Sequence, residues 1–290
     1  MDLTNIDTIR LILREYNMSA QKRLGQHFLT NTQVLQEITQ AARLTDTDEV
    51  LEIGPGLGTL TRALAQTAQR VVAIEKDISM AKACRGINSD LSNMKIVEGN
   101  ALALSDAFFK EYFPKKKYKL VANLPYYLTS AIIRFFLESK YRPVMMVLMV
   151  QKEVAERMIA LPPDANLLSV AVQFYSTAEI ITLVPKQNFW PIPKVDSAVI
   201  RIIPHQKLPT PGRSSPARAG EIDEKKFFRL VKAGFGERRK QLHNSLSGGL
   251  HLDDAKVKQV LAKSRIAPER RAQTLTIPDW IKLYQNIDKL

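Results

Sequence analysis

The chain has 290 residues, of which 45% are hydrophobic, and its formal net charge at pH 7 is +13. This length suits one large domain and a smaller one. The single cysteine, Cys84, excludes internal disulfides and cysteine-based metal clusters, and the four histidines have no metal-ligand spacing. We expect a cytoplasmic monomer that binds no metal and enters no membrane, and the N-terminus has no signal-peptide pattern.

Positive charge is concentrated in the last third of the chain. Residues 206–290 contain 18 lysines and arginines against 9 acidic residues, whereas residues 1–205 contain 24 against 20. Such an asymmetry favours a polyanionic partner. We therefore predict that the C-terminal region binds nucleic acid.

The first predicted elements are two short helices separated by a basic loop. Apolar residues recur at helical spacing between residues 1 and 16, and a second helix is expected to begin at Asn31 or Thr32. The loop between them runs from Lys22 to Leu29. Its cations, Lys22 and Arg23, are candidate RNA contacts, although composition alone favours an ordinary surface loop.

The stretch from Val50 to Thr61 is typical of a strand, a tight turn and the start of a helix. Three glycines, Gly54, Gly56 and Gly58, follow the apolar run at alternate positions. Glycines let the backbone adopt positive φ and approach a ligand closely, and a plain turn between strand and helix is the alternative. Glu75 ends the next strand 19 residues after Gly56, near the spacing at which an acid meets ribose hydroxyls.

The pattern E-x-G-x-G-x-G, which begins at Glu52, is similar to the cofactor site of Rossmann-like class I methyltransferases. The similarity implies S-adenosyl-L-methionine as the cofactor. That molecule has no pyrophosphate, so the glycines would make room for its amino-acid moiety. Glu75 would accept hydrogen bonds from both ribose hydroxyls.

Strands and helices alternate from Glu49 onward. We predict strands at residues 49–53, 71–75, 94–97, 118–122, 144–150, 168–176 and 197–203, and helices at 58–67, 77–87, 129–139 and 151–160. This alternation indicates an α/β fold with a parallel sheet covered on both faces. Ligands of such sheets bind beyond the carboxyl ends of the strands, so the residues that follow the strands form the candidate site.

The predicted strand at 118–122 runs directly into Asn123-Leu124-Pro125-Tyr126. Proline stiffens the turn, which aims the Asn123 amide and the Leu124 carbonyl at one point. Two fixed acceptors satisfy both hydrogens of an exocyclic amine and direct its lone pair at a methyl sulfonium, so positioning supplies the catalysis. Tyr126 offers a flat face for a base. Asn-x-Pro alone is typical of an ordinary turn, but after a strand and beside a cofactor pattern it favours a methyltransferase.

Residues 206–220 have the composition of a flexible basic linker, with three prolines, two glycines and no acid. From residue 221 the pattern is purely helical, with helix starts expected near Arg238, Asp253 and Thr276. We predict a small helical RNA-binding domain at residues 221–290.

Three consecutive cations, Arg238, Arg239 and Lys240, are the candidate phosphate contacts of this helical domain. A solvated charged face is the alternative interpretation. The remaining residues, 1–205, form the predicted methyltransferase domain.

Along nearly its whole length the sequence resembles the small-subunit ribosomal RNA adenine N6-dimethyltransferases, the KsgA/RsmA type. The matching stretches are residues 22–29, 52–61, 123–126, 151–157, 193–199 and 230–235. The blocks Gln151–Arg157 and Pro193–Val199 are more specific than a general methyltransferase motif. The resemblance implies transfer of two methyl groups to each of two adjacent adenines near the 3′ end of 16S ribosomal RNA, in a 30S assembly intermediate.

The resemblance also implies roles for individual residues. It places the cofactor at His27, Leu29, Gly54, Gly56, Glu75, Asn100 and Asn123. The target adenine would lie against Asn123, Leu124, Pro125 and Tyr126, with Phe189 stacked on its other face after the base leaves its stack. Packing of Phe189 in the core is the alternative.

The chain departs from the family pattern at three places. His27 stands where the family commonly has Asn, and Asn100 stands where it commonly has Asp. An uncharged acceptor at residue 100 leads us to expect modestly weaker cofactor binding. The segment 159–168 lacks the usual glycine and tyrosine pattern, which could alter a loop beside the RNA.

Three other functions share part of this pattern. A 23S ribosomal RNA adenine methyltransferase of the resistance type has the same cofactor and Asn-Leu-Pro-Tyr motifs, but the blocks at 151–157 and 193–199 favour the small-subunit family. An RNA-binding assembly factor whose catalysis is dispensable remains open. A small-molecule methyltransferase is disfavoured by the basic C-terminal region.

Overall fold

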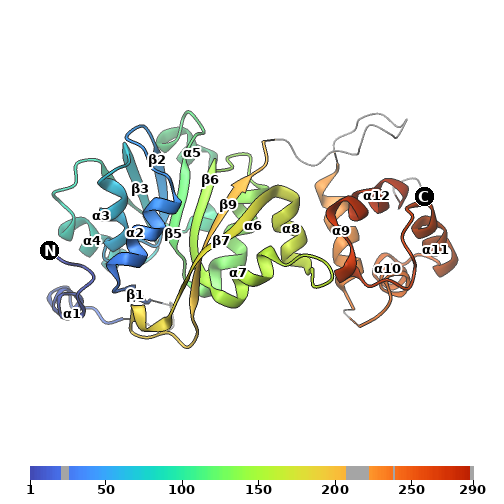
Figure 1. Ribbon diagram of the computed structural model, residues 1–290. Helices are drawn as coiled ribbons and strands as arrows, with labels where there is room; N and C mark the ends of the chain where they lie inside the picture. The colour runs from blue at the N-terminus through green and yellow to red at the C-terminus, as the bar shows by residue number, and fades with distance from the viewer. Residues whose placement is uncertain (21–25, 207–221, 238, 288–290) are drawn as a thin grey trace. The chain divides into compact units, whose positions relative to one another are not determined.

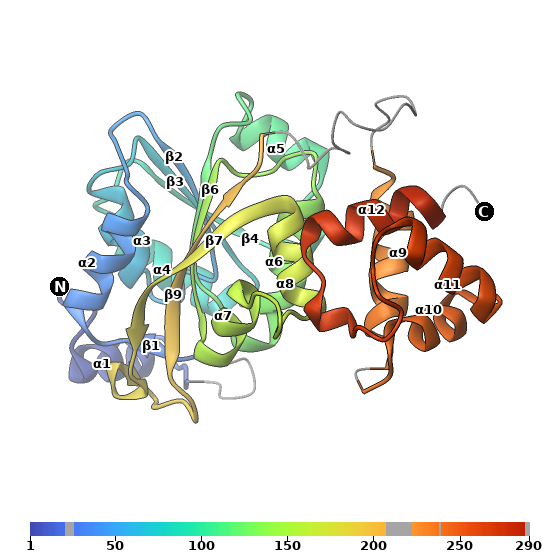
Figure 2. The ribbon, with the colours of Figure 1, turned by 45° about the vertical axis from the view of Figure 1, so that its right-hand side comes forward.

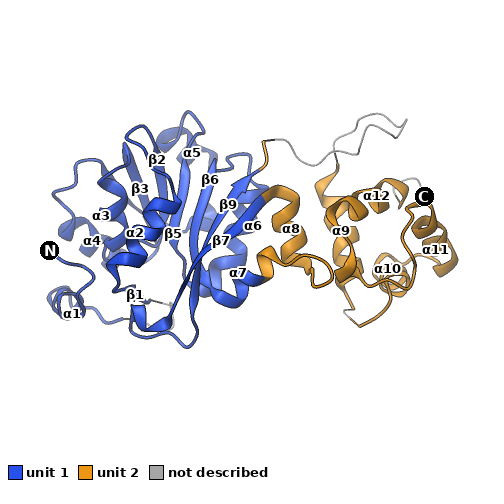
Figure 3. Ribbon diagram, in the orientation of Figure 1, with its two compact units in different colours: residues 1–156, 177–204 blue, residues 157–176, 205–290 orange. Residues whose placement is uncertain are grey.

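The computed structural model describes residues 1–20, 26–206, 222–237 and 239–287. Contacts group the chain into two units, one of residues 1–156 with 177–204 and the other of residues 157–176 with 205–290 (Figures 1 and 3). Residues 157–176, which the sequence-based division placed in the methyltransferase domain, thus group with the second unit. The predicted linker lies outside the described residues except for Gln206.

The first unit is built on a seven-stranded sheet within the described residues, in the order β4-β3-β2-β5-β6-β9-β7. Its strands are β2 (Glu49–Ile53), β3 (Arg70–Glu75), β4 (Met94–Glu98), β5 (Lys119–Asn123), β6 (Met145–Gln151), β7 (Ser176–Val184) and β9 (Ser197–Pro204). The pairs from β4 to β6 are parallel, whereas β9 runs antiparallel to β6. The direction of winding reverses between β2 and β5, which opens a crevice at their carboxyl ends.

Helices cover both faces of this sheet. They are α2 (Thr32–Ala41), α3 (Thr59–Ala65), α4 (Ile78–Ile87), α5 (Asp106–Tyr112), α6 (Thr129–Glu138) and α7 (Lys152–Ile159). Figures 1 and 2 show α2 and α3 on one side of the sheet and α6 on the other. Successive strand residues such as Val50 and Leu51 are therefore both buried, as in a sheet covered on two faces.

The N-terminal segment contributes a helix and a short strand. Helix α1 (Ile6–Glu15) begins after Asn5, whose side chain accepts from the backbone N–H groups of the first turn. Strand β1 (Phe28–Leu29) pairs antiparallel with β8 (Phe189–Trp190). This pairing ties Phe28 and Leu29 to a segment about 160 positions later in the chain.

The strand predicted at residues 168–176 is wrong, because helix α8 (Leu167–Tyr175) occupies this segment. The Asn166 side chain accepts from the backbone N–H groups of Leu168 and Ser169, and the Ser169 hydroxyl accepts from the backbone N–H of Asn166. This capping box starts a helix, and a short apolar run alone does not distinguish helix from strand. Strand β7 and helix α5 were not predicted.

The second unit is helical in its described residues, as predicted. Its later helices are α9 (Glu224–Phe235), α10 (Leu242–Leu250), α11 (Asp254–Lys263) and α12 (Ile277–Ile287). The predicted starts are confirmed for two of them: Asp253 caps α11, and the side chains of Thr276 and Asp279 cap α12 reciprocally. Helices α9 and α12 lie so close that a Cβ atom on Gly234 would come within 2.5 Å of Trp280.

No helix within the described ranges is long and apolar enough to span a bilayer.

Candidate functional site

A cavity of about 260 Å³ opens at the carboxyl ends of β2, β3 and β5. It brings together all of the predicted cofactor residues, His27, Leu29, Gly54, Gly56, Glu75, Asn100 and Asn123. It is also lined by Leu124, Pro125 and Tyr126 of the predicted catalytic group. Parallel strands with loops at one edge place these residues side by side, although they are far apart in the sequence.

The glycine turn between β2 and α3 forms one wall. Gly54, Gly56 and Gly58 all have positive φ, at 67°, 59° and 91°, which residues with a side chain rarely adopt. Gly54 and Gly56 line the cavity, whereas Gly58 is not among the described residues that line it. Gly54 and Gly56 therefore suit their predicted role, which is to let the backbone approach the cofactor closely.

Glu75 ends β3 and holds the turn from the cavity side. Its Oε2 accepts from the backbone N–H of Gly56 at 3.3 Å, and its Oε1 accepts from that of Asp77 at 3.0 Å. Burial raises the pKa of Glu75, and these backbone hydrogen bonds oppose the rise. The carboxyl group, which lines the cavity, is thus fixed in position.

Glu52, on β2, is a fully buried carboxyl that also lines the cavity. Burial, together with the nearby charge of Glu75, raises the pKa of Glu52 to about 8. Its Oε2 has no hydrogen-bond partner among the described residues. The Thr61 hydroxyl, which is likewise buried and without a partner among the described residues, is the neighbour that opposes this rise in pKa.

The turn after β5 is held by contacts from three directions. The backbone N–H of Leu124 donates to the Met149 carbonyl at 3.1 Å, and the Asn123 Nδ2 donates to the His27 carbonyl at 3.3 Å. The Tyr126 hydroxyl lies 2.8 Å from the Ser197 hydroxyl. Because Nδ2 of Asn123 is committed as a donor, its Oδ1 keeps its capacity to accept from a substrate amine.

His27 packs against the same turn. Its ring is stacked on Tyr126 with centroids 5.9 Å apart and an interplanar angle of 24°. Its Nδ1 lies 2.6 Å from the Pro191 carbonyl. A carbonyl only accepts, so Nδ1 carries the hydrogen, and a neutral imidazole then has an acceptor at Nε2.

Asn100 follows β4 and is exposed at the cavity edge. Its Oδ1 accepts from the backbone N–H of Leu102 at 3.1 Å, which caps the short 3-10 turn η2 (Ala101–Ala103). The single side-chain oxygen of Asn100 is therefore already shared with the backbone.

Phe189 exposes only 2% of its surface and packs in the core cluster with Leu29 and Ile38. It is not among the described residues that line the cavity. Stacking of Phe189 on a target base stays a prediction, and it requires the ring to become accessible.

The cations predicted to bind RNA are only partly described. Lys22, Arg23 and Arg238 lie outside the described residues. Arg239 and Lys240 are exposed, and Lys240 pairs with Glu237 at 2.7 Å. No group of three or more metal-ligating side chains occurs within the described residues.

Sequence reasoning missed several residues that line the cavity, namely Gln26, Ile38, Asp77 and Tyr127. Tyr127 is the most notable, because this aromatic residue is 58% exposed on the 3-10 turn η3 (Tyr126–Leu128). Its place directly after the Asn-Leu-Pro-Tyr segment was the available signal.

Comparison with known proteins gives matches over nearly the whole chain. A family model described as "Ribosomal RNA adenine dimethylase" matches residues 17–284. Two relatives are named Ribosomal RNA small subunit methyltransferase A: one from Dehalococcoides mccartyi is 41% identical over 93% of this chain and 89% of the relative, and one from Clostridioides difficile is 38% identical over 96% and 94%. A solved dimethyladenosine transferase from Plasmodium falciparum is 26% identical with a TM-score of 0.72, covering 91% of this chain and 98% of that chain. The chain belongs to the ribosomal RNA adenine dimethylase family.

Proposed function

We propose that this protein transfers methyl groups from S-adenosyl-L-methionine to N6 of two adjacent adenines near the 3′ end of 16S ribosomal RNA, giving N6,N6-dimethyladenosines. The observation that carries the proposal is the cavity that gathers Glu75, Asn100 and Asn123 from three strand ends beside the glycine turn. Family membership and the names of the relatives from Dehalococcoides and Clostridioides support the choice of substrate.

The residues of the cavity fit S-adenosyl-L-methionine. That cofactor carries a positive sulfonium, an ammonium group, two ribose hydroxyls and an adenine amine, so it is rich in donors and positive charge. The cavity supplies acceptors at Glu75, Asn100 and Asn123. Glu75, held by two backbone N–H groups, is the best-ordered of these acceptors. When bound, the cofactor supplies the methyl group.

The chain itself positions the nucleophile. The Asn123 Oδ1 and the Leu124 carbonyl accept the two hydrogens of the adenine N6 amine, and Tyr126 packs against the base. These bonds draw the nitrogen lone pair out of conjugation and direct it toward the methyl group. No side chain removes a proton beforehand, because the amine proton becomes acidic only after transfer. The positively charged nitrogen then releases it to water, and the electron pair of the broken methyl–sulfur bond stays on the sulfur. Orientation and electrostatics account for the rate.

The substrate is RNA within a 30S assembly intermediate in the cytoplasm. The net positive charge of the C-terminal third supports contacts to phosphate that carry no base specificity. Arg239 and Lys240 are exposed residues of this kind.

Methylation of defined particles tests the proposal. Purified protein and labelled cofactor are incubated with undermethylated 30S particles and, in parallel, with 23S ribosomal RNA, and the digested RNA is analysed by mass spectrometry. We expect dimethyladenosine in 16S RNA alone. Label that appears only in 23S RNA would replace this function with that of the resistance-type enzymes.

A further inference from the structure

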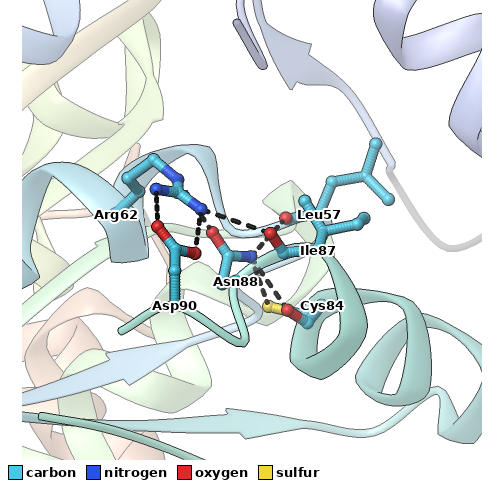
Figure 4. Close-up of polar contacts among 6 residues, drawn as sticks. All are labelled: Leu57, Arg62, Cys84, Ile87, Asn88 and Asp90. Atoms are coloured by element: carbon cyan, nitrogen blue, oxygen red, sulfur yellow. Dashed lines mark hydrogen bonds and ion pairs between the residues drawn. The ribbon is translucent and has the colours of Figure 1, made fainter. Parts of the chain in front are cut away.

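The glycine turn has a second support, from residues that are not among the described residues lining the cavity (Figure 4). Asn88, the residue after helix α4, is completely buried. Its Nδ2 donates to the Leu57 carbonyl at 3.0 Å and to the Cys84 carbonyl at 2.8 Å. Leu57 lies between Gly56 and Gly58, so this amide is bonded directly to the backbone of the turn.

Arg62 fixes which way the Asn88 amide faces. Its Nε donates to Asn88 Oδ1 at 3.2 Å, while its Nη1 and Nη2 donate to the two carboxylate oxygens of Asp90 at 2.8 and 2.7 Å. Figure 4 shows these residues as one connected network. Two-point pairing with a carboxylate holds a guanidinium firmly, so the Asn88 oxygen and nitrogen cannot exchange places.

The third glycine of the turn, Gly58, leaves room for the Asn88 side chain. A Cβ atom on Gly58 would lie 2.2 Å from the Asn88 Nδ2 and 3.0 Å from the Cys84 Sγ. The amide of Asn88 thus occupies the space where a side chain at residue 58 would be. Gly58 and Asn88 fit together, whereas Gly54 and Gly56 face the cavity.

We propose that Asn88 is a positioning residue for cofactor binding, an inference that rests on the proposed use of S-adenosyl-L-methionine. A turn with three glycines has many alternative conformations. By anchoring the Leu57 carbonyl, Asn88 keeps Gly54 and Gly56 in the arrangement that faces the cavity. The cofactor then binds to a turn that is already ordered, which lowers the entropic cost of binding.

The variant Asn88→Asp tests this role, because aspartate has the same shape but its carboxylate cannot donate. We expect the dissociation constant of S-adenosyl-L-methionine, measured by calorimetry, to rise roughly tenfold. The KM for cofactor should rise in parallel. The KM for 30S particles, and kcat at saturating cofactor, should stay within about twofold, which a general loss of structure would not produce.

Asn93→Asp is the matched control. The Asn93 Nδ2 also donates to two carbonyls, those of Ala65 and Ala68 at 2.9 and 3.0 Å, but at the opposite end of helix α3. The Asn93→Asp variant therefore loses the same kind of hydrogen bonds without changing any contact of the glycine turn. We expect its cofactor affinity to match that of the wild type.

A second variant, Asp90→Ala, keeps the test decisive if Asn88→Asp fails to fold. The Asp90 side chain is 61% exposed, so its removal does not disturb the core. We expect cofactor affinity to fall about two- to threefold as Arg62 is released. A cofactor affinity equal to that of Asn93→Asp, measured for Asn88→Asp or, where that variant does not fold, for Asp90→Ala, would overturn the role of Asn88. Wild-type protein that binds cofactor but methylates no 30S particle would refute the proposed function while leaving this affinity comparison intact.

Discussion

Side chains are held more firmly in the cavity of the first unit than in the basic turn after α9, by which we mean Arg239 and Lys240 of the second unit. Glu75 accepts from two backbone N–H groups, and Asn123 donates to the His27 carbonyl. By contrast, Lys240 and its partner Glu237 are both 54% exposed and only three residues apart. Such an exposed pair contributes little stability.

This difference matches what each region has to do. Methyl transfer depends on reacting atoms held at fixed distances and angles. The side chains of the cavity therefore need hydrogen-bond partners within the fold. Phosphate binding depends mainly on charge near the backbone of the nucleic acid, so mobile cations suffice. Substitutions in the cavity should therefore have large, specific effects, and substitutions in the basic turn should have small effects that depend on salt.

The largest effect is expected from Glu75→Ala. The variant loses the acceptor proposed for the ribose hydroxyls and leaves the N–H groups of Gly56 and Asp77 without their partner. Cofactor affinity measured by calorimetry should fall about a hundredfold. Glu75→Gln, which keeps one oxygen, should lose less. Unchanged affinity in Glu75→Ala would show that the turn does not depend on this carboxylate.

Glu52→Gln should change how stability depends on pH. Because the folded-state pKa of Glu52 is raised to about 8, the unfolded chain loses this proton first as pH rises above about 4.5. The free energy of unfolding of the cofactor-free wild type therefore decreases between about pH 4.5 and pH 8 through this group. The variant lacks that decrease. The free energy of unfolding of the variant minus that of the wild type should therefore rise by at least about 1 kcal/mol between about pH 4.5 and pH 8. Parallel urea-denaturation profiles for the two proteins would contradict the assignment.

The double variant Arg239→Ala/Lys240→Ala tests the other side of the comparison. We expect the KM for 30S particles to rise severalfold at moderate salt, because two positive charges near RNA are lost. The dependence of log KM on log salt should weaken by about one to two units of slope. Lys95→Ala, which removes an exposed cation from strand β4, serves as the control. An equal rise in the KM of the control would show that Arg239 and Lys240 do not contact the RNA.

The smallest effect is expected from Asn100→Asp. The Asn100 oxygen already accepts from the backbone N–H of Leu102, so an aspartate would keep that cap and add a second, charged oxygen for the cofactor amine. Cofactor affinity should rise about two- to threefold. Unchanged or weaker affinity would show that residue 100 does not contact the cofactor.

Much of the fold and the site could be predicted from the sequence because their signals are local. The glycine turn directly follows β2, Glu75 and Asn123 are the last residues of β3 and β5, and parallel strands bring their carboxyl ends to one edge. The caps at Asn31 and Asp253 likewise identify helix starts within a few residues.

The parts that could not be predicted depend on contacts between distant residues. The hydrogen bond between His27 and the Pro191 carbonyl joins residues 164 positions apart, and the bond from Asn88 to Leu57 spans 31. Neither has a local sequence pattern. The apolar segment of α8 failed for another reason, because its composition suits a strand as well as a buried helix and only the cap at Asn166 distinguishes them.

The most direct test of the account is methyl transfer from labelled S-adenosyl-L-methionine to undermethylated 30S particles by the wild type and by Asn123→Ala. The account predicts that the wild type places label in dimethyladenosine of 16S RNA. It predicts that Asn123→Ala loses this product while its cofactor affinity falls by less than about tenfold, because Glu75 and the glycine turn remain in place. Wild-type levels of product from Asn123→Ala would contradict the central claim that this amide positions the reacting amine.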